Sequence, residues 1–169
     1  MTVKDLETLY DYGNWANKRL LDVLSTLTPE QFTMPVTGSS ASVRHKMVHM
    51  LSAEWGWLDR CGGEKRGPAL SPGDYPTAEA LAGQWMRVDR SMRSFLLSLR
   101  DQDLVRLVEF SFGGGPKYAM PLGELLHHAA IHGIHHRGQV SMLLRSLGCV
   151  PPGFDILFYY GRAAGLESL

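Results

Sequence analysis

Histidines are concentrated in one short stretch of the sequence. Residues 124–139 carry five of the seven histidines in the chain: His127, His128, His132, His135 and His136. His128, His132 and His136 follow one another at intervals of four, and residues four apart on an α-helix lie on one face with Cβ atoms roughly 5–6 Å apart. Imidazole nitrogens are common ligands of zinc and related divalent ions. The spacing therefore predicts a metal site on a helix.

The phase of that helix separates the histidines from one another. At about 100° per residue, the apolar positions form a stripe within roughly 20–80° of His132, made of Leu122, Leu125, Ala129, Val140, Leu143 and Leu147. His136 falls inside this stripe and His132 at its margin, whereas His128, His135 and His127 lie further out. A lone histidine on such a stripe is usually a core residue with a hydrogen-bond partner. Burying two neutral imidazoles side by side is costly unless their ring nitrogens are satisfied, so a metal is the better interpretation of the pair His132 and His136.

The pair needs a third ligand, because catalytic zinc-type sites usually take three protein ligands and leave one position for water or substrate. The remaining histidines, His45 and His49, are themselves four residues apart on another expected helix. Neither spacing nor helical phase selects one of them. A ferritin-like di-iron site fits less well, because it needs two Glu-x-x-His motifs and the chain has one, at Glu124. A haem held by two histidines is a minor alternative.

The overall charge argues against several classes of partner. Seventeen basic and seventeen acidic residues give a formal net charge of zero and a pI near 7.1, which leaves no electrostatic footprint for nucleic acid or an anionic membrane surface. We expect a small-molecule substrate, or a second copy of the chain, as partner. The N-terminal residues lack a signal-peptide pattern, and no apolar run approaches the roughly 20 residues of a membrane span, so a cytoplasmic location is expected.

Four long helices are expected to position the histidines. Apolar periodicity and cap residues predict them at about 3–26, from a cap at Ser40 or Ser42 to Gly62, from Thr77 to about Arg100, and from Pro121 to Gly148. Residues 63–76 are rich in proline and glycine and form a long crossover between the second and third helices, and residues 105–118 form a short hairpin or an extended loop. The sequence thus predicts an all-α fold, a single four-helix-bundle domain over residues 1–169.

Three motifs together resemble a known family. Residues 12–17 (YGNWAN), residues 49–57 (HMLSAEWGW) and residues 132–139 (HGIHHRGQ), followed by Gly148, Asp155 and Tyr159 in the tail, resemble the signatures of the DinB-like family of four-helix-bundle metal proteins over nearly the whole chain. The resemblance implies that one divalent ion, zinc or nickel in the first place, is held by His49, His132 and His136. One departure is Ile131, where the family often has asparagine.

The resemblance also implies a function. The family includes transferases and isomerases that use a low-molecular-weight thiol such as bacillithiol or mycothiol, so we expect a metal-dependent thiol S-transferase or isomerase that acts on small electrophilic molecules, and a homodimer. The ion would lower the pKa of a thiol or water in its open position. The alternative is a non-catalytic metal-binding stress-response protein in which the ion is structural.

Several other polar residues have two interpretations. Glu54 is expected either to orient a ligand or the bound water as a catalytic group, or to form an ion pair on its own helix. His135 is expected to support a ligand or to lie on the surface. We expect Arg137 and Gln139 to lie at a dimer or helix contact. We expect the other three histidines to be solvated or structural: His45, His127 and His128.

Overall fold

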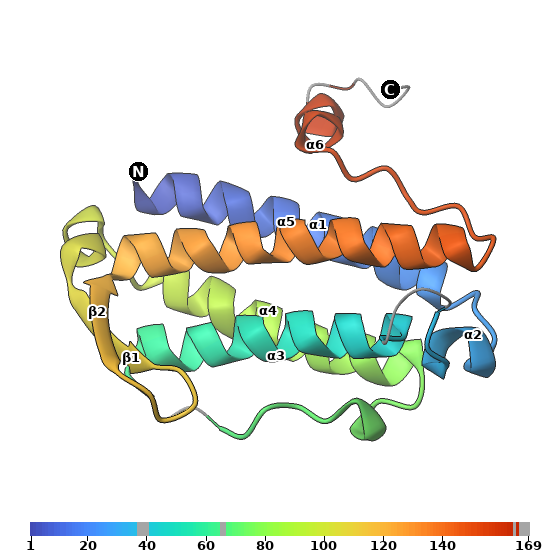
Figure 1. The fold of residues 1–169 in the computed structure, drawn as a ribbon. Coiled ribbons are helices and arrows are strands. Elements are labelled where there is room, and N and C mark those ends of the chain that lie inside the picture. The colour runs from blue at the N-terminus through green and yellow to red at the C-terminus, as the bar shows by residue number, and fades with distance from the viewer. Residues whose placement is uncertain (37–40, 65–66, 164, 166–169) are drawn as a thin grey trace.

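Four long α-helices dominate the structure, a computed structural model that describes residues 1–36, 41–64, 67–163 and 165 (Figure 1). They are α1 (Val3–Leu24), α3 (Val43–Gly62), α4 (Ala78–Leu97) and α5 (Leu122–Ser146). The shorter elements are α2 (Pro29–Thr33), α6 (Ile156–Ala163), the 3-10 turns η1 (Pro72–Asp74) and η2 (Asp101–Val105), and the strands β1 (Leu107–Ser111) and β2 (Lys117–Pro121). The expectation of a mostly helical chain with four long helices is confirmed. Within the described ranges no helix has the length and apolar character needed to cross a bilayer.

Side-chain caps set where the long helices begin. At α1, the Thr2 hydroxyl accepts from the Asp5 N–H at 3.2 Å while the Asp5 carboxylate accepts from the Thr2 N–H at 2.8 Å, which satisfies two backbone donors reciprocally. Ser42 caps α3 and Thr77 caps α4 in the simpler way, each with its hydroxyl accepting from a backbone N–H of the first turn. The alternative cap at Ser40 lies outside the described residues.

Glycines and side-chain hydrogen bonds set where the helices end. Gly63 and Gly148 follow α3 and α5 with φ angles of 81° and 75°, a left-handed conformation that glycine adopts without a Cβ clash. The helix α4 ends at Leu97 rather than near Arg100. Its C-cap residue Ser98 donates its hydroxyl to a carbonyl oxygen of the last turn, and such local bonds compete with continuation of the helix.

The long helices pack in a ring in which α1 contacts α4 and α5, and α3 contacts the same two helices. The segment between α3 and α4 runs back along the length of the molecule, so that these two helices are neighbours pointing in the same direction (Figure 1). The sequence had left open whether they would be antiparallel neighbours. The interface of α3 with α5 is therefore opposite the interface of α1 with α4.

The core is divided into two apolar clusters with a polar layer between them. One cluster lies towards α2 and includes Leu20, Met47, Leu51, Leu81, Trp85, Val140 and Leu144. The other lies towards the hairpin and includes Leu6, Tyr10, Trp57, Met92, Leu122 and Leu125. On each long helix, polar residues separate the two sets: Asn17 on α1, Glu54 on α3, Asp89 on α4, and His132, His136 and Arg137 on α5. The histidines thus lie at the level where the apolar core is interrupted.

The segment before α5 is the hairpin that the sequence allowed. Strand β1 pairs with β2 in antiparallel register, from Leu107 opposite Pro121 to Ser111 opposite Lys117. Gly113 and Gly114 make the turn with φ angles of 56° and 77°, which only glycine adopts freely. The hairpin ends where α5 begins, so it lies beside the N-terminal part of the histidine-bearing helix.

The C-terminal tail folds back over α1. The Tyr12 hydroxyl donates to the Phe154 carbonyl oxygen at 2.8 Å. On α6, the Tyr159 ring lies 5.9 Å from the Tyr12 ring and 5.7 Å from the Trp15 ring between centroids. These contacts fix α6 on the outside of α1 (Figure 1).

Candidate metal centre

The packing of α3 against α5 brings three imidazoles together. The His136 Nε2 lies 3.1 Å from the His49 Nε2 and 3.0 Å from the His132 Nε2. One ligand atom from each residue lies within 4.8 Å of the others. His132 and His136 are one turn apart on α5, while His49 comes from α3, so this grouping exists only in the packed structure.

The geometry fits a metal ion held by three histidines. Zinc–nitrogen bonds are roughly 2.0–2.1 Å long, so two tetrahedral ligands are separated by about 3.3–3.4 Å. The two Nε2–Nε2 distances of 3.0 and 3.1 Å are close to this separation. A hydrogen bond between two imidazoles can satisfy one pair of ring nitrogens, but three nitrogens facing one another need a shared partner. A divalent ion would supply that partner.

Gln139 sets the proton position on one of the three rings. The Gln139 Oε1 lies 2.8 Å from the His136 Nδ1, and an amide oxygen can only accept a hydrogen bond. The proton of neutral His136 is therefore on Nδ1, and the lone pair of Nε2 faces the other two histidines. The Gln139 amide N–H in turn donates to the His135 Nε2 at 2.9 Å. The sequence analysis had placed Gln139 at a dimer or helix contact, and its spacing of three from His136 was the signal for this role.

Electrostatics keeps the three imidazoles neutral. Loss of hydration, together with the neighbouring His136 and His49, lowers the pKa of His132 to about 4. Partial loss of hydration, helped by Lys46, lowers the pKa of His49 as well. Desolvation also lowers the pKa of His136, although its hydrogen bond with Gln139 acts in the opposite direction. At neutral pH each ring is therefore uncharged and keeps one unprotonated nitrogen, which is the state a metal requires.

The histidine group is open on its outer side. His136 is buried, at 8% exposure, His132 is half-buried and His49 is exposed. A small cavity of about 190 Å³ opens beside His49 between α3 and the crossover, where it is lined by Ser52, Leu70 and Pro72 among others. A small molecule can therefore reach His49, the outermost of the three histidines, from solvent.

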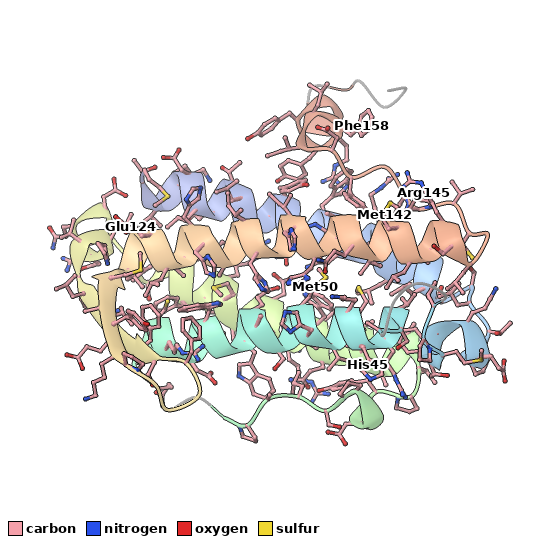
Figure 2. All side chains as sticks on the ribbon, viewed as in Figure 1. His45, Met50, Glu124, Met142, Arg145 and Phe158 are labelled. Carbon is pink, nitrogen blue, oxygen red and sulfur yellow. The ribbon has the colours of Figure 1, made fainter. Side chains whose placement is uncertain are left out.

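The other histidine of α3 has a different environment. His45 shares a hydrogen bond of 2.7 Å between its Nδ1 and the hydroxyl of the helix cap Ser42. It lies on the side of α3 that faces the crossover (Figure 2). The structure thus brings His49, and not His45, to the α5 pair, as the family resemblance implied.

Glu54 lies in the polar layer, on another side of α3 from His49. The two residues are five apart, which is roughly 140° around a helix. Burial raises the pKa of the Glu54 carboxyl to about 7, and Asp89 adds to the rise, while Arg137 and Trp85 act against it. The groups around this carboxyl therefore come from α4 and α5. A catalytic role for Glu54 stays a prediction.

Arg137 anchors the histidine helix to α1. Its side chain is 2% exposed, and its Nη1 donates to the Asn17 Oδ1 at 3.0 Å. The guanidinium carbon lies 5.3 Å from the centre of the Tyr12 ring, within range of a cation–π interaction. A Cβ on Gly133 would lie 3.1 Å from the Nη1, so this mid-helix glycine makes room for the guanidinium. The expected helix contact of Arg137 is present, and it joins α5 to α1.

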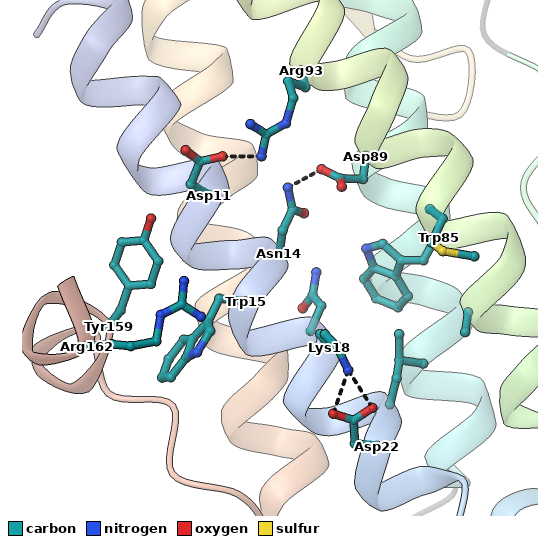
Figure 3. Close-up of a pocket in the computed structure, with 14 residues that line it drawn as sticks. Asp11, Asn14, Trp15, Lys18, Asp22, Trp85, Asp89, Arg93, Tyr159 and Arg162 are labelled. Atoms are coloured by element: carbon teal, nitrogen blue, oxygen red, sulfur yellow. Dashed lines mark hydrogen bonds and ion pairs between the residues drawn. The ribbon is translucent and has the colours of Figure 1, made fainter. Parts of the chain in front are cut away.

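A larger cavity lies on the opposite face of the molecule. It measures about 610 Å³ and lies between α1, α4 and α6. Two ion pairs lie in its lining, Asp11 with Arg93 and Lys18 with Asp22, and Asn14 donates to Asp89 (Figure 3). The Arg162 guanidinium lies 6.0 Å from the centre of the Tyr159 ring. The three histidines belong to the opposite interface, so this cavity and the candidate metal centre are separate features.

The fold and the site define a mostly helical protein in which two packed helices present a three-histidine group able to hold a metal ion. The chain belongs to the DinB family, which matches residues 1–165. It is 23% identical over 156 residues to Protein DinB of Bacillus subtilis (strain 168), covering 89% of this chain and 91% of that protein. It is also 27% identical over 125 residues to the uncharacterized protein YizA of the same organism, covering 74% of this chain and 77% of that protein.

Solved structures show the same fold. A DinB-like protein from Bacillus cereus ATCC 10987 superimposes with a TM-score of 0.71 at 23% identity, covering 90% of this chain and 97% of that one. The DinB-like protein YjoA from Bacillus subtilis gives a TM-score of 0.60 at 22% identity, covering 89% and 96%. These similarities establish the fold of the chain.

Proposed function

We propose that this chain is a divalent-metal-binding protein, a single four-helix-bundle domain over residues 1–169, whose ligands are His49, His132 and His136. The observation that carries the proposal is the convergence of the three Nε2 atoms, at 3.0 and 3.1 Å from the central one. The neutral state of the rings and the tautomer set by Gln139 support it. Zinc and nickel are the proposed ions, because imidazole donors suit both.

The proposed activity is a thiol-dependent transfer or isomerisation of small electrophilic molecules, with a low-molecular-weight thiol as co-substrate. A divalent ion would supply Lewis acidity that lowers the pKa of a thiol or a water molecule. The three protein ligands are uncharged, so the site favours an anionic partner such as a thiolate over a neutral one. The exposure of His49 supports access for such a partner. Glu54 is the proposed carboxylate that assists, acting from the polar layer.

The alternative is a metal-binding stress-response protein without turnover. It is supported by the origin of the ligands, because His49 on α3 and the pair on α5 would make the ion a cross-link between two helices. The histidines also lie where the apolar core is interrupted, so a cross-link there would replace missing packing.

The test is metal analysis of the untagged protein, followed by measurement of thiol consumption with a panel of electrophiles. Alanine at His49, His132 or His136 should remove most of the metal, whereas His127→Ala on the exposed side of α5 should retain it. Full retention of metal in His136→Ala would refute the ligand assignment. Metal retention without thiol consumption for any electrophile would favour the structural alternative.

We also propose a cytoplasmic homodimer. Among the described residues, α3 has no large exposed apolar side chain, whereas α5 has three of them: Ile131, Ile134 and Met142. This outer face of α5 is therefore the better candidate for the contact. Sedimentation at micromolar concentration that shows only an 18.8 kDa species would refute the dimer.

A further inference from the structure

A continuous series of aromatic rings leads from the histidine group to the hairpin. The His132 ring lies 5.9 Å from the His128 ring, and the His128 ring lies 5.3 Å from the Trp57 ring at an interplanar angle of 77°. Trp57 continues the series, with its ring 5.4 Å from Phe110 and 6.3 Å from Phe112. We call this set, completed by one tyrosine of the hairpin, the aromatic wall: Trp57, Phe110, Phe112, Tyr118 and His128.

The wall is held rigidly at its base. Trp57 is only 5% exposed, and the Arg60 guanidinium lies over its ring at 4.9 Å. The strand register places Phe110 opposite Tyr118, and their rings are stacked with centroids 5.7 Å apart and an interplanar angle of 29°. Such offset and edge-to-face pairs are favourable geometries for aromatic side chains. The wall is therefore a preformed set of rings from α3, the hairpin and α5.

The outer part of the wall faces solvent. Phe112 is 59% exposed and Tyr118 is 49% exposed, although each contacts Phe110. Packing of the core accounts for Trp57, but it does not account for two large rings left half in water at the end of a hairpin. Exposed apolar surface that adjoins a candidate site is a common feature of ligand binding.

We propose that the aromatic wall binds a planar apolar group of the molecule whose polar end occupies the histidine site, so that the substrate class is aromatic. This inference rests on the proposed metal-binding function. The commitment to a planar, apolar occupant follows from the wall itself, which offers ring faces and ring edges, and from its continuity with His132 through His128. The cavity of about 610 Å³ between α1 and α4 has no such connection to the histidines, because it lies at the opposite interface.

The test uses three metal-chelating hydroxamates that share one head group and differ in their tail. Acetohydroxamate carries a methyl group, benzohydroxamate one ring and biphenyl-4-carbohydroxamate two rings. Each is titrated into the cobalt-substituted protein while the visible spectrum of the ion is followed. Affinity should rise with the number of rings, and the advantage of the two-ring tail over the methyl tail should fall about tenfold in the double variant Phe112→Ala, Tyr118→Ala.

The acetohydroxamate affinity serves as the internal reference, and it should be the same in the double variant and the wild type. Met86→Ala removes an equally exposed apolar side chain from α4, away from the wall, and should leave all three affinities unchanged. If wild type and double variant both bind cobalt and show the same preference for the longer tail, the inference is overturned while the proposed metal binding stands. Failure of the wild type to bind cobalt would overturn the inference together with the proposed function. Dissociation of a dimer in the double variant would show that a second copy covers the wall, which would also overturn the inference.

Discussion

His136 and Gln139 face each other across one turn of α5, with the ring Nδ1 and the amide Oε1 2.8 Å apart. This contact holds the His136 ring at its Nδ1 and directs its Nε2 towards His49 and His132. The amide N–H of Gln139 is used as well, because it donates to His135. A ligand ring, the residue that orients it and a further histidine are thus joined within four residues of one helix.

Removal of this orienting contact should weaken metal binding. Gln139→Leu leaves the His136 Nδ1–H without its acceptor, and loss of such a partner typically lowers metal affinity by about 10–100-fold. Gln139→Glu retains an acceptor oxygen and should bind metal at least as well as the wild type. Competition with a chromogenic chelator measures both affinities, and Glu124→Gln, an exposed change on the same helix, is the matched control. Wild-type affinity in the leucine variant would mean that Gln139 does not position the ligand.

Removal of the ion should lower thermal stability. An ion that binds only the folded state adds about 2.7 kcal/mol when its free concentration is 100 times its Kd. For a domain of this size we expect the Tm to rise by roughly 5–10 °C between the chelator-treated and the metal-loaded protein. Calorimetry of both forms measures this difference, which should disappear in His132→Ala and persist in His127→Ala. An equal gain in Tm for His132→Ala would place the stabilising ion elsewhere.

Two glycines of α5 should respond differently to alanine. A Cβ at Gly138 meets nothing within 4 Å, whereas a Cβ at Gly133 would lie 3.1 Å from the buried Arg137 Nη1. Gly138→Ala should therefore raise the free energy of unfolding by about 1 kcal/mol through helix propensity. Gly133→Ala should lose that gain and be less stable than Gly138→Ala by roughly 1–2 kcal/mol. Urea denaturation of both variants decides the matter, and equal stabilisation would mean that the guanidinium moves away without cost.

Glu54 should make folding stability depend on pH. The pKa of its carboxyl is raised from 4.5 to about 7, first of all by burial, so the folded state binds this proton more tightly than the unfolded state. The contribution is fully present below pH 4.5 and is lost as the pH rises to about 7, by at most roughly 3 kcal/mol. Glu54→Gln, which cannot ionise, should therefore gain stability relative to the wild type between pH 5 and pH 8. Denaturation curves at several pH values test this, and parallel profiles for the two proteins would contradict it.

Much of the fold could be predicted from the sequence, because helices are determined by nearby residues. The caps at Thr2, Ser42 and Thr77 act on backbone groups within one turn, and apolar periodicity reports which face of a helix is buried. The same local rule paired His132 with His136, since residues four apart on a helix are neighbours. Even the contact of Gln139 with His136 is a property of one helix turn.

The choice of the third histidine and the surroundings of Glu54 required the tertiary structure. His45 and His49 have equivalent spacing, and only the rotation of α3 about its axis against α5 directs His49 to the pair and leaves His45 beside Ser42. That rotation depends on how the whole apolar surface of one helix packs into the other, which no local pattern contains. For the same reason the sequence by itself determined which residues could bind a metal, while packing between distant segments decided which of them meet at one point.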